Sequence, residues 1–373
     1  MLIVATPNPD SVAETFIRQH IRMVAPGATS VVYFEGEANE IAGLPSLKLP
    51  REKNSRIGSM VNLISAGYPG TLTKAQSDQF ADFVKQHRAQ AVLAEFGQTG
   101  CRLWKSCKKA GVPLYVFFHG FDASVGGRSA TRRFGYRRMS AYVSKVFVAT
   151  NFFLEKVVKA GVPREKIDVN SYGLATDEFL PDSQKDPDLI LAVGRMVEKK
   201  APLVTVNAFA RIANEVPTVR LEMIGDGPLL ESVKQESKRL DLEERVILHG
   251  SKDQSFVKQK MSKASVFVQH SVTAPNGDTE SLGVSLLEAM ACEVPVVATR
   301  HNGFVETVED GVTGILVEEY DVEAMANGIR QIITDKSFSA AMGKAGRERV
   351  KTRFHAETQA SKLREKMGLD SAA

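Results

Sequence analysis

The strongest constraint on the fold is the alternation of short apolar runs with longer segments of helical periodicity, which occurs in two series along the chain. Such alternation is typical of parallel sheets whose strands are joined by helices. The expected strands of the first series are Leu2–Ala5, Ser30–Phe34, Ala91–Glu95, Pro113–Phe118 and Lys145–Ala149, and helical patterns fall between them at Ser11–Met23, Lys74–His87 and Asn151–Ala160. We therefore expect an α/β fold.

The second series predicts another α/β domain. Its expected strands are Leu189–Val193, Arg220–Ile224, Val246–Leu248, Ser265–Gln269, Pro295–Ala298 and Gly314–Val317. The segment 172–187 between the two series has no periodicity and ends in a polar, Pro-punctuated stretch that is typical of a linker. After Thr334 only helical patterns remain, to about Met367. A chain of 373 residues also exceeds one ordinary core, so two domains are expected.

Composition and charge narrow the possible location and partners. The hydrophobic fraction of 43% and the charged fraction of 25% are those of a soluble globular protein. The segment 1–6 is predicted to be a buried strand and not a signal peptide. The three cysteines are too few and too badly spaced for a disulfide framework, so we expect a cytoplasmic protein. Residues 1–180 contain 23 Lys and Arg against 15 Asp and Glu, which would attract anions or an anionic membrane surface.

The pair Glu280 and Glu288 is the most informative candidate site. On one continuous helix, eight residues would separate the two carboxylates by about 12 Å and turn them about 80° apart. The preceding residues 276–279 have loop composition, so the helix is predicted to start near Gly283. Glu280 then lies in the loop before the helix, and Glu288 lies on its second turn.

The start of this helix is suited to an anion. The free N–H groups of Leu282, Gly283, Val284 and Ser285 point out of the helix start, where a phosphate binds well. A site with phosphate donors in the middle and a carboxylate on each side fits a molecule with a central diphosphate and a polyol at each end. A nucleotide-diphosphate sugar has this shape.

Residues at two further strand ends are candidates for binding the same molecule. Strand Leu189–Val193 leads into Gly194 and Arg195, and Lys200 follows shortly after. The guanidinium of Arg195 can donate two hydrogen bonds to one phosphate, and the ammonium of Lys200 is a compact positive charge. Both groups would stabilise negative charge on a leaving diphosphate. Lys199 lies one position away, and Lys200 is preferred by register. Gly225 follows strand Arg220–Ile224 in a Gly-Asp-Gly-Pro turn, where glycine lets the backbone approach a ligand.

The run from Asn276 to Ala298 resembles retaining glycosyltransferases of the GT-B fold, family 4 type (group 1). The segment 11–17, at the entry to the first expected helix, resembles the exopolysaccharide or colanic-acid-type transferases of that family. The resemblance covers most of residues 189–335. In the first half it rests on the strand order and on His119-Gly120-Phe121-Asp122. The chain departs from the family pattern at Ala201 and Glu293, where that family usually has glycine.

The resemblance implies two Rossmann-like domains facing a central cleft. Residues 1–175 would form the acceptor-side domain, residues 188–352 the donor-binding domain, and residues 353–373 a helical crossover back to the N-terminal domain. It implies catalytic roles for His119, Arg195, Lys200 and Glu280, and nucleotide-sugar binding by Gly225, Leu282, Gly283, Val284 and Glu288. Glu288 would hold the ribose diol and Glu280 the sugar hydroxyls. No obligatory metal or other cofactor is implied, and a UDP-sugar is the favoured donor.

The expected function is therefore retaining sugar transfer from a nucleotide-diphosphate donor to a lipid-linked or saccharide acceptor. A nucleotide-sugar epimerase of the same fold and a non-catalytic homologue remain as alternatives; the epimerase would convert donor without acceptor. The cluster Arg128–Arg138 contains five arginines and could contact an anionic acceptor or the inner face of the cell membrane. A solvated helix face explains it equally well, and no nucleic-acid motif accompanies it.

Overall fold

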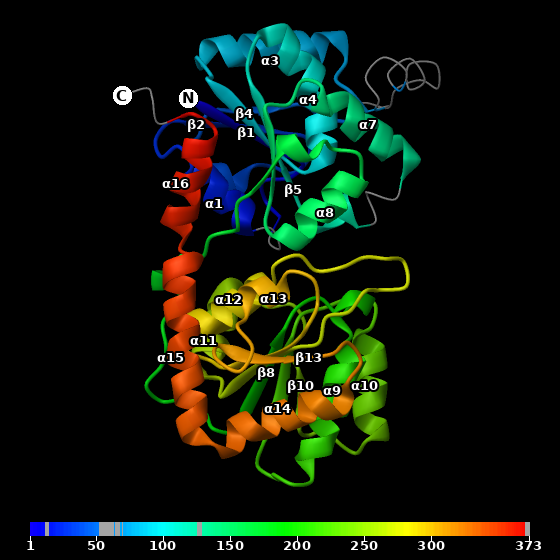
Figure 1. Ribbon diagram of the computed structural model, residues 1–373, viewed down its shortest axis with the longest axis vertical. Helices are drawn as coiled ribbons and strands as arrows, with labels where there is room; N and C mark the ends of the chain where they lie inside the picture. Colours follow the sequence, from blue (N-terminus) through cyan, green and yellow to red (C-terminus); the bar gives the residue numbers. More distant parts are fainter. Residues whose placement is uncertain (12–14, 52–62, 64–67, 69, 125–128, 370–373) are drawn as a thin grey trace. The chain divides into compact units, whose positions relative to one another are not determined.

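The computed structural model describes residues 1–11, 15–51, 63, 68, 70–124 and 129–369 (Figure 1). Contacts between residues divide the chain into two units. One unit comprises Met1–Gly173 and Ala356–Ala373, and the other comprises Leu174–His355. Each unit contains a parallel sheet with helices packed on it, so the expected α/β class is confirmed.

The first unit has a seven-stranded sheet in the order β3-β2-β1-β4-β5-β6-β7. Its strands are β1 Leu2–Thr6, β2 Thr29–Tyr33, β3 Ser46–Lys48, β4 Ala91–Glu95, β5 Leu114–Phe118, β6 Lys145–Val148 and β7 Ile167–Val169. All five strands expected from the sequence are present. The sequence missed β3 and β7, which form the two edges with three residues each, because segments this short show no alternation.

Helices cover both faces of this sheet. They are α1 Thr15–Met23, α3 Lys74–Gln86, α4 Gly97–Ala110, α5 Gly120–Ala123, α7 Ala130–Ser140, α8 Asn151–Lys159 and α16 Ala356–Lys366. Ile3 and Ala5 pack in one apolar cluster with residues of α3, α4, α7 and α8. The last helix, α16, packs on α1, where Arg364 Nε donates to the Val24 carbonyl at 2.7 Å.

The second unit has a six-stranded sheet in the order β10-β9-β8-β11-β12-β13. Its strands are β8 Leu189–Val193, β9 Arg220–Ile224, β10 Val246–Leu248, β11 Val266–Gln269, β12 Val296–Thr299 and β13 Gly314–Val317. All six were expected. The strand order reverses between β8 and β11, and open α/β sheets bind ligands beyond the carboxyl ends of their strands at such a point.

The helices of the second unit form layers on both sides of its sheet (Figure 1). They are α9 Pro202–Ala213, α10 Leu230–Arg239, α11 Gln254–Lys263, α12 Val284–Ala291, α13 Phe304–Thr307, α14 Val322–Thr334 and α15 Lys336–Arg353. Helices α9, α10 and α14 share one apolar cluster with the strands. Helices α11 and α12 lie on the other side, with α12 against β11 and β12.

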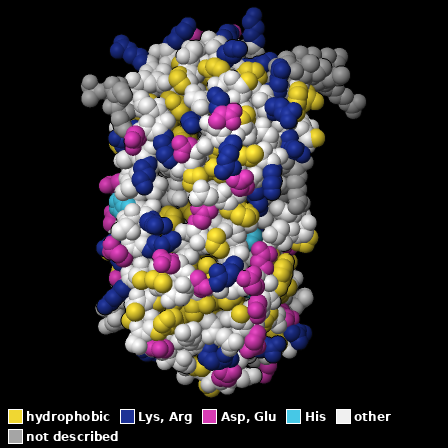
Figure 2. Space-filling view, in the orientation of Figure 1, with side chains coloured by type: hydrophobic (Ala, Val, Ile, Leu, Met, Phe, Trp, Pro, Cys, Tyr) yellow, Lys and Arg dark blue, Asp and Glu magenta, His cyan; other side chains and the backbone are white. Residues whose placement is uncertain are grey.

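The surface carries charge of both signs. On the face drawn in Figure 2, Lys and Arg side chains are interspersed with Asp and Glu side chains. No helix in the part of the chain that the structure describes is long and apolar enough to cross a membrane.

Two of the non-glycine residues in the left-handed region bear on the comparison with the resembled family. Ala201 has φ 38° just before α9, and Glu293 has φ 55° in the turn between α12 and β12. These are the two positions where the resembled family usually has glycine. The chain therefore keeps the glycine-type turn and tolerates the strain of a Cβ, which is roughly 1–2 kcal/mol for a left-handed L-residue.

We predict that Ala201→Gly and Glu293→Gly each raise the free energy of unfolding by about 0.5–1 kcal/mol, because relief of backbone strain exceeds the added entropy of the unfolded chain. Urea denaturation measures this change. Ala210→Gly, inside α9, is the matched control and should lower stability by a similar amount. Destabilisation at all three positions would contradict the strained-turn interpretation.

Candidate functional site

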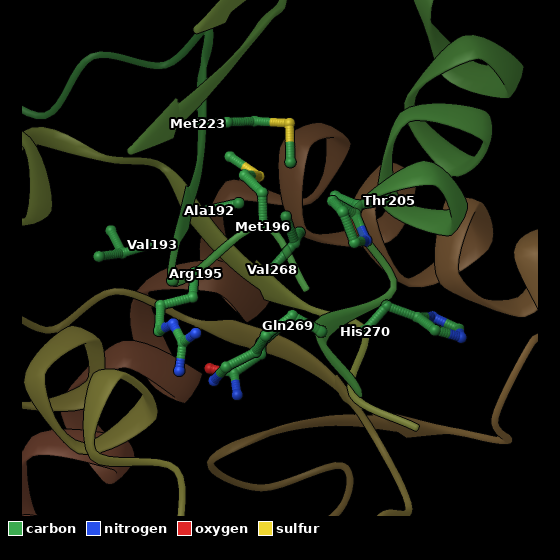
Figure 3. A pocket seen from close by; sticks show the side chains of 12 residues that line it. Ala192, Val193, Arg195, Met196, Thr205, Met223, Val268, Gln269 and His270 are labelled. Carbon is green, nitrogen blue, oxygen red and sulfur yellow. The ribbon is translucent and has the colours of Figure 1, made fainter. Parts of the chain in front are cut away.

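A pocket lies at the point where the strand order of the second sheet reverses (Figure 3). The end of β8, the residues after it and the end of β11 line most of the pocket, and α9 and β9 complete it. Figure 3 shows Met196 and Met223 on one side of the pocket, with the polar ends of Arg195 and Gln269 together on another. The lining residues are Ala192, Val193, Gly194, Arg195, Met196, Lys200, Pro202, Thr205, Met223, Val268, Gln269 and His270.

Gly225 is required by close packing of two strand-end turns. A Cβ on Gly225 would lie 2.0 Å from the Gly194 carbonyl oxygen, and one on Gly227 would lie 2.5 Å from the Met196 carbonyl oxygen. The Gly225 N–H donates to the Gly250 carbonyl at 2.9 Å. Its N–H is therefore used in a bond between the turns that follow β9 and β10. The glycine brings the β8 and β9 turns together, and its assignment as a ligand-binding residue stays a prediction.

Arg195 is the exposed cation of the pocket. Its guanidinium makes no ion pair or hydrogen bond with the described part of the chain. It lies directly after β8, at the end of a buried strand that fixes its backbone. An unpaired guanidinium in a pocket is suited to binding an anion.

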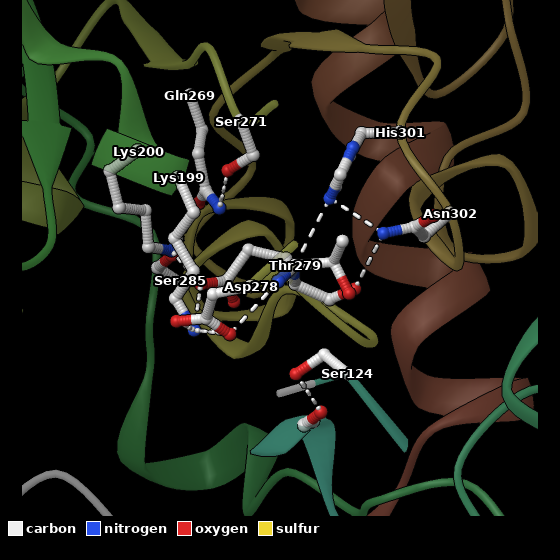
Figure 4. Close-up of polar contacts among 12 residues, drawn as sticks. Ser124, Lys199, Lys200, Gln269, Ser271, Asp278, Thr279, Ser285, His301 and Asn302 are labelled. Carbon is white, nitrogen blue, oxygen red and sulfur yellow. Dashed lines mark hydrogen bonds and ion pairs between the residues drawn. The ribbon is translucent and has the colours of Figure 1, made fainter. Parts of the chain in front are cut away.

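Lys199 and Lys200 both approach the carboxylate of Glu280. The Nζ atoms lie 3.3 Å and 3.5 Å from the same Oε1 atom. Lys199 also pairs with Asp278, at 3.3 Å (Figure 4). Lys199 is thus shared between two carboxylates, whereas Lys200 pairs with Glu280 and also lines the pocket. A ligand in the pocket would therefore meet Lys200, and the role of Lys200 stays a prediction.

The pKa of Glu280 reflects this pairing. Burial alone would raise it, but the charges of Lys200 and Lys199 outweigh the burial and bring the pKa to about 2. Burial also lowers the pKa of Lys200, against the attraction of Glu280. Glu280 is therefore a permanently ionised group between two ammonium groups.

The main chain of Glu280 is held by the turn after β12. His301 Nε2 accepts the N–H of Glu280 at 3.1 Å, and Asn302 Nδ2 donates to the carbonyl of Glu280 at 3.0 Å. His301 in turn faces the carboxylate of Glu319. Sequence analysis missed all three residues. The polar pair His301-Asn302, one residue after a buried strand, was the signal that could have found two of them.

Helix α12 begins as the sequence predicted. Gly283 precedes it with φ 77°, and a Cβ there would lie 2.6 Å from Phe304 Cε1, so only glycine fits. Glu280 lies in the loop before α12, and Glu288 is its fifth residue. In the described chain the N–H groups of residues 282–285 donate no hydrogen bond, so four donors remain for an anion.

Glu288 contrasts with Glu280. Its carboxylate has no hydrogen bond or ion pair among the described residues. Burial raises its pKa to about 7, and the charges of Lys258 and Lys200 offset that only in part. The charge of Lys200 acts on the carboxylates of both Glu280 and Glu288. The two carboxylates, Lys200 and the start of α12 therefore belong to one site. A half-buried carboxylate without a partner among the described residues is suited to accepting hydrogen bonds from a ligand.

His119 is sealed within the first unit. The sequence placed it at an open strand end, whereas its exposed fraction is 3% and both ring nitrogens are occupied. Nε2 lies 2.8 Å from Glu95 Oε2, and Nδ1 lies 2.7 Å from the Tyr172 hydroxyl. The other oxygen of Glu95 faces His20 Nδ1 at 2.8 Å. The catalytic assignment of His119 stays a prediction.

The protons in this chain of groups can be assigned. Burial raises the pKa of Glu95, but the imidazoles of His20 and His119 bring it to about 2, so the carboxylate only accepts. His119 therefore donates from Nε2 and can accept from Tyr172 at Nδ1. The sequence missed Glu95, His20 and Tyr172, which come from three separate segments.

Other candidate chemistry is limited. Within residues 1–11, 15–51, 63, 68, 70–124 and 129–369, no group of three or more His, Cys, Asp or Glu could hold a metal ion. Arg128 of the arginine cluster lies outside the described residues. The other four arginines, Arg132, Arg133, Arg137 and Arg138, are on α7.

Two family models together match most of the chain. Residues 176–349 match the family model "Glycosyl transferases group 1", and residues 14–173 match the "Glycosyl transferase 4-like domain". The chain is 30% identical to the amylovoran biosynthesis glycosyltransferase AmsK of Erwinia amylovora, over 73% of this chain and 68% of that protein. It is 32% identical to the putative colanic acid biosynthesis glycosyltransferase WcaL of Escherichia coli K12, over 72% and 68%.

A solved structure gives the same fold. Anabaena Alr3699/HepE in complex with UDP-glucose superposes with a TM-score of 0.80 and 20% identity over 99% of both chains. This agreement confirms the expected GT-B fold.

The raised pKa of Glu288 predicts a pH-dependent effect on stability. Between pH 4.5 and about 7 the folded protein holds a proton that the unfolded chain releases, so Glu288 lowers stability as pH rises through this range. We predict that Glu288→Gln raises Tm by about 3 °C or more at pH 8, and that the difference is several-fold smaller near pH 5. Calorimetry of the ligand-free protein measures both values.

Glu243→Gln, at an exposed position in the same unit, is the control and should leave Tm nearly unchanged at both pH values. A Glu288→Gln effect of equal size at pH 5 and pH 8 would show that burial of the charge is not its cause.

Proposed function

Because the chain belongs to the group 1 glycosyltransferase family, we propose that it transfers a sugar, with retention at the anomeric carbon, from a UDP-sugar to a hydroxyl group of a lipid-linked or saccharide acceptor. The observation that carries the proposal is the arrangement around α12. Four unpaired N–H groups stand between a carboxylate paired to lysines, Glu280, and a carboxylate without a partner, Glu288.

The diphosphate would occupy the centre of this arrangement. The amides of Leu282, Gly283 and Val284 would donate to it, and Arg195 and Lys200 would bind it from the β8 side. Breaking the bond between the anomeric carbon and the diphosphate builds negative charge on the leaving group. Fixed cations and amides stabilise that charge without having to reorganise during the reaction.

The two carboxylates would bind the two polyol ends. Glu288 would accept hydrogen bonds from the ribose hydroxyls, which would replace the partners that it lacks. Glu280 would orient hydroxyls of the transferred sugar. Its own ion pair with Lys200 would loosen when that lysine binds the diphosphate, and this would free a carboxylate oxygen for the sugar.

The donor and acceptor classes rest on different arguments. The structural similarity to HepE with bound UDP-glucose supports a UDP-sugar as the donor. The relatives named for amylovoran and colanic acid biosynthesis support a saccharide acceptor. A panel of UDP-, GDP- and ADP-sugars, assayed for donor hydrolysis without acceptor, tests the donor class, and hydrolysis of none of them would contradict the proposal. Formation of an epimerised donor would favour the epimerase.

Substitutions of Glu288, Arg195 and Lys200 test their proposed contacts with the donor. Glu288→Ala should weaken UDP binding at least tenfold, since a charge-assisted hydrogen bond contributes about 1.5–3 kcal/mol. Arg195→Ala and Lys200→Ala should lower turnover at saturating donor by about a hundredfold. Calorimetric titration and steady-state kinetics measure these effects. Near wild-type turnover in either cation variant would exclude that residue from the leaving-group site.

The second prediction concerns the acceptor side of the molecule. Three phenylalanines, one each on α5, α7 and α8, are exposed: Phe121 by 39%, Phe134 by 44% and Phe152 by 39%. Arg132 lies 4.9 Å from the ring centre of Phe121, and Lys156 lies 4.7 Å from that of Phe152. Basic and aromatic side chains together suit the interface of an anionic membrane.

Changing Arg132, Arg133, Arg137 and Arg138 together to Gln should abolish binding to vesicles that contain phosphatidylglycerol, because each basic residue contributes about 1 kcal/mol there. UDP affinity should not change, and high salt should imitate the loss in the wild type. Sedimentation with vesicles measures the effect. The control replaces four exposed basic residues of α15: Lys336, Lys344, Lys351 and Arg353. Equal loss in both variants would contradict a localised surface.

A further inference from the structure

The turn after β12 forms hydrogen bonds to the peptide groups on both sides of Glu280. His301 Nε2 accepts the N–H of Glu280 at 3.1 Å, and Asn302 Nδ2 donates to the carbonyl of Glu280 at 3.0 Å. His301 is fully buried, with an exposed fraction of 0%. Figure 4 shows the two side chains reaching from the turn after β12 toward the loop that contains Thr279. The two contacts fix the direction in which the Cα of Glu280 projects its side chain.

The tautomer of His301 follows from its neighbours. Its Nδ1 faces Glu319 Oε1, and a carboxylate only accepts hydrogen bonds, so Nδ1 carries the proton. Nε2 then has a free electron pair and can receive the N–H of Glu280. The amide nitrogen of Asn302 also lies 2.6 Å from Nε2. The other oxygen of Glu319 accepts the N–H of Thr273 at 3.0 Å, so the carboxylate is itself anchored to the loop.

Glu280 has no helix or strand of its own to hold it. It lies in the irregular segment between β11 and α12. Its carboxylate end is held by Lys199 and Lys200, and its main-chain end is held by His301 and Asn302. Catalytic groups must be held within a fraction of an ångström, and a displacement of about 1 Å can lower a rate a hundredfold.

We propose that His301, oriented by Glu319, is a positioning residue that aims the Glu280 carboxylate at the transferred sugar. The proposal rests on the proposed function, because it assumes that Glu280 contacts the sugar. His301 itself need not touch the substrate. It acts by presenting a proton-free nitrogen to a main-chain N–H, as residues that support a reactive group do in other sites.

Two substitutions separate this role from simple packing. His301→Leu keeps an apolar body of similar size and removes the acceptor. His301→Gln keeps a side-chain oxygen that can reach the same N–H. We expect His301→Leu to lower turnover of UDP-glucose, or of the best donor in the panel, at least tenfold at saturating donor. His301→Gln should recover most of the loss. The affinity for UDP, which lacks the sugar, should change less than threefold in both variants.

A second measurement reports on the contact without any activity. Hydrogen exchange at the Glu280 amide should be at least tenfold faster in His301→Leu than in the wild type, and near wild type in His301→Gln. Asn302→Gly keeps the left-handed backbone, at φ 47°, while it removes the side-chain donor. It should give a smaller loss of turnover. His355→Leu, in the same unit but outside the site, is the control and should change neither quantity.

Three results would overturn the proposal. These are unchanged turnover in a folded His301→Leu variant, a loss of UDP affinity as large as the loss of turnover, and unchanged exchange at the Glu280 amide. A wild type that converts no donor would instead contradict the proposed function. In that case the exchange rates alone decide whether His301 holds Glu280.

Discussion

The partial burial of one negative charge organises the candidate site. Glu280 lies in an irregular loop, and a carboxylate withdrawn from water is stable only when cations and hydrogen bonds compensate it. Lys199 and Lys200 supply the cations, since the short helical turn after β8 directs both toward one oxygen. The loop between β11 and α12 is therefore tied to the end of β8 by charge. These are also the charges that a diphosphate would meet on entering the pocket.

Close packing of the backbone brings these charges together. The turns after β8 and β9 approach so closely that Gly225 and Gly227 leave no room for a Cβ. Gly283 does the same where α12 begins beneath Phe304. Elsewhere the chain accepts strain in place of glycine, at Ala201 and Glu293. In each case a tight turn fixes where a strand or helix begins or ends. The polar groups of the candidate site lie at these positions.

The two units use polar groups in opposite ways. In the first, Glu95, His20, His119 and Tyr172 satisfy one another inside the fold, so they rigidify the end of the sheet. In the second, Arg195, Glu288 and the first N–H groups of α12 have no partners among the described residues. A ligand gains binding free energy when it forms hydrogen bonds to polar groups beside a pocket that lack partners. This contrast supports the proposal that the second unit binds the donor.

The sequence by itself determined the features that depend on neighbours along the chain. It predicted eleven of the thirteen strands described, the start of α12 at Gly283 and the placement of Glu280 and Glu288 on different elements, because periodicity and turn chemistry are local. Only the tertiary structure decided that His119 is sealed, that both lysines share Glu280, and that His301 braces it. These contacts join residues 21 to 81 positions apart, at the ends of strands whose order in the sheet differs from their order in the chain. No local pattern encodes such contacts, since they arise when the sheet assembles.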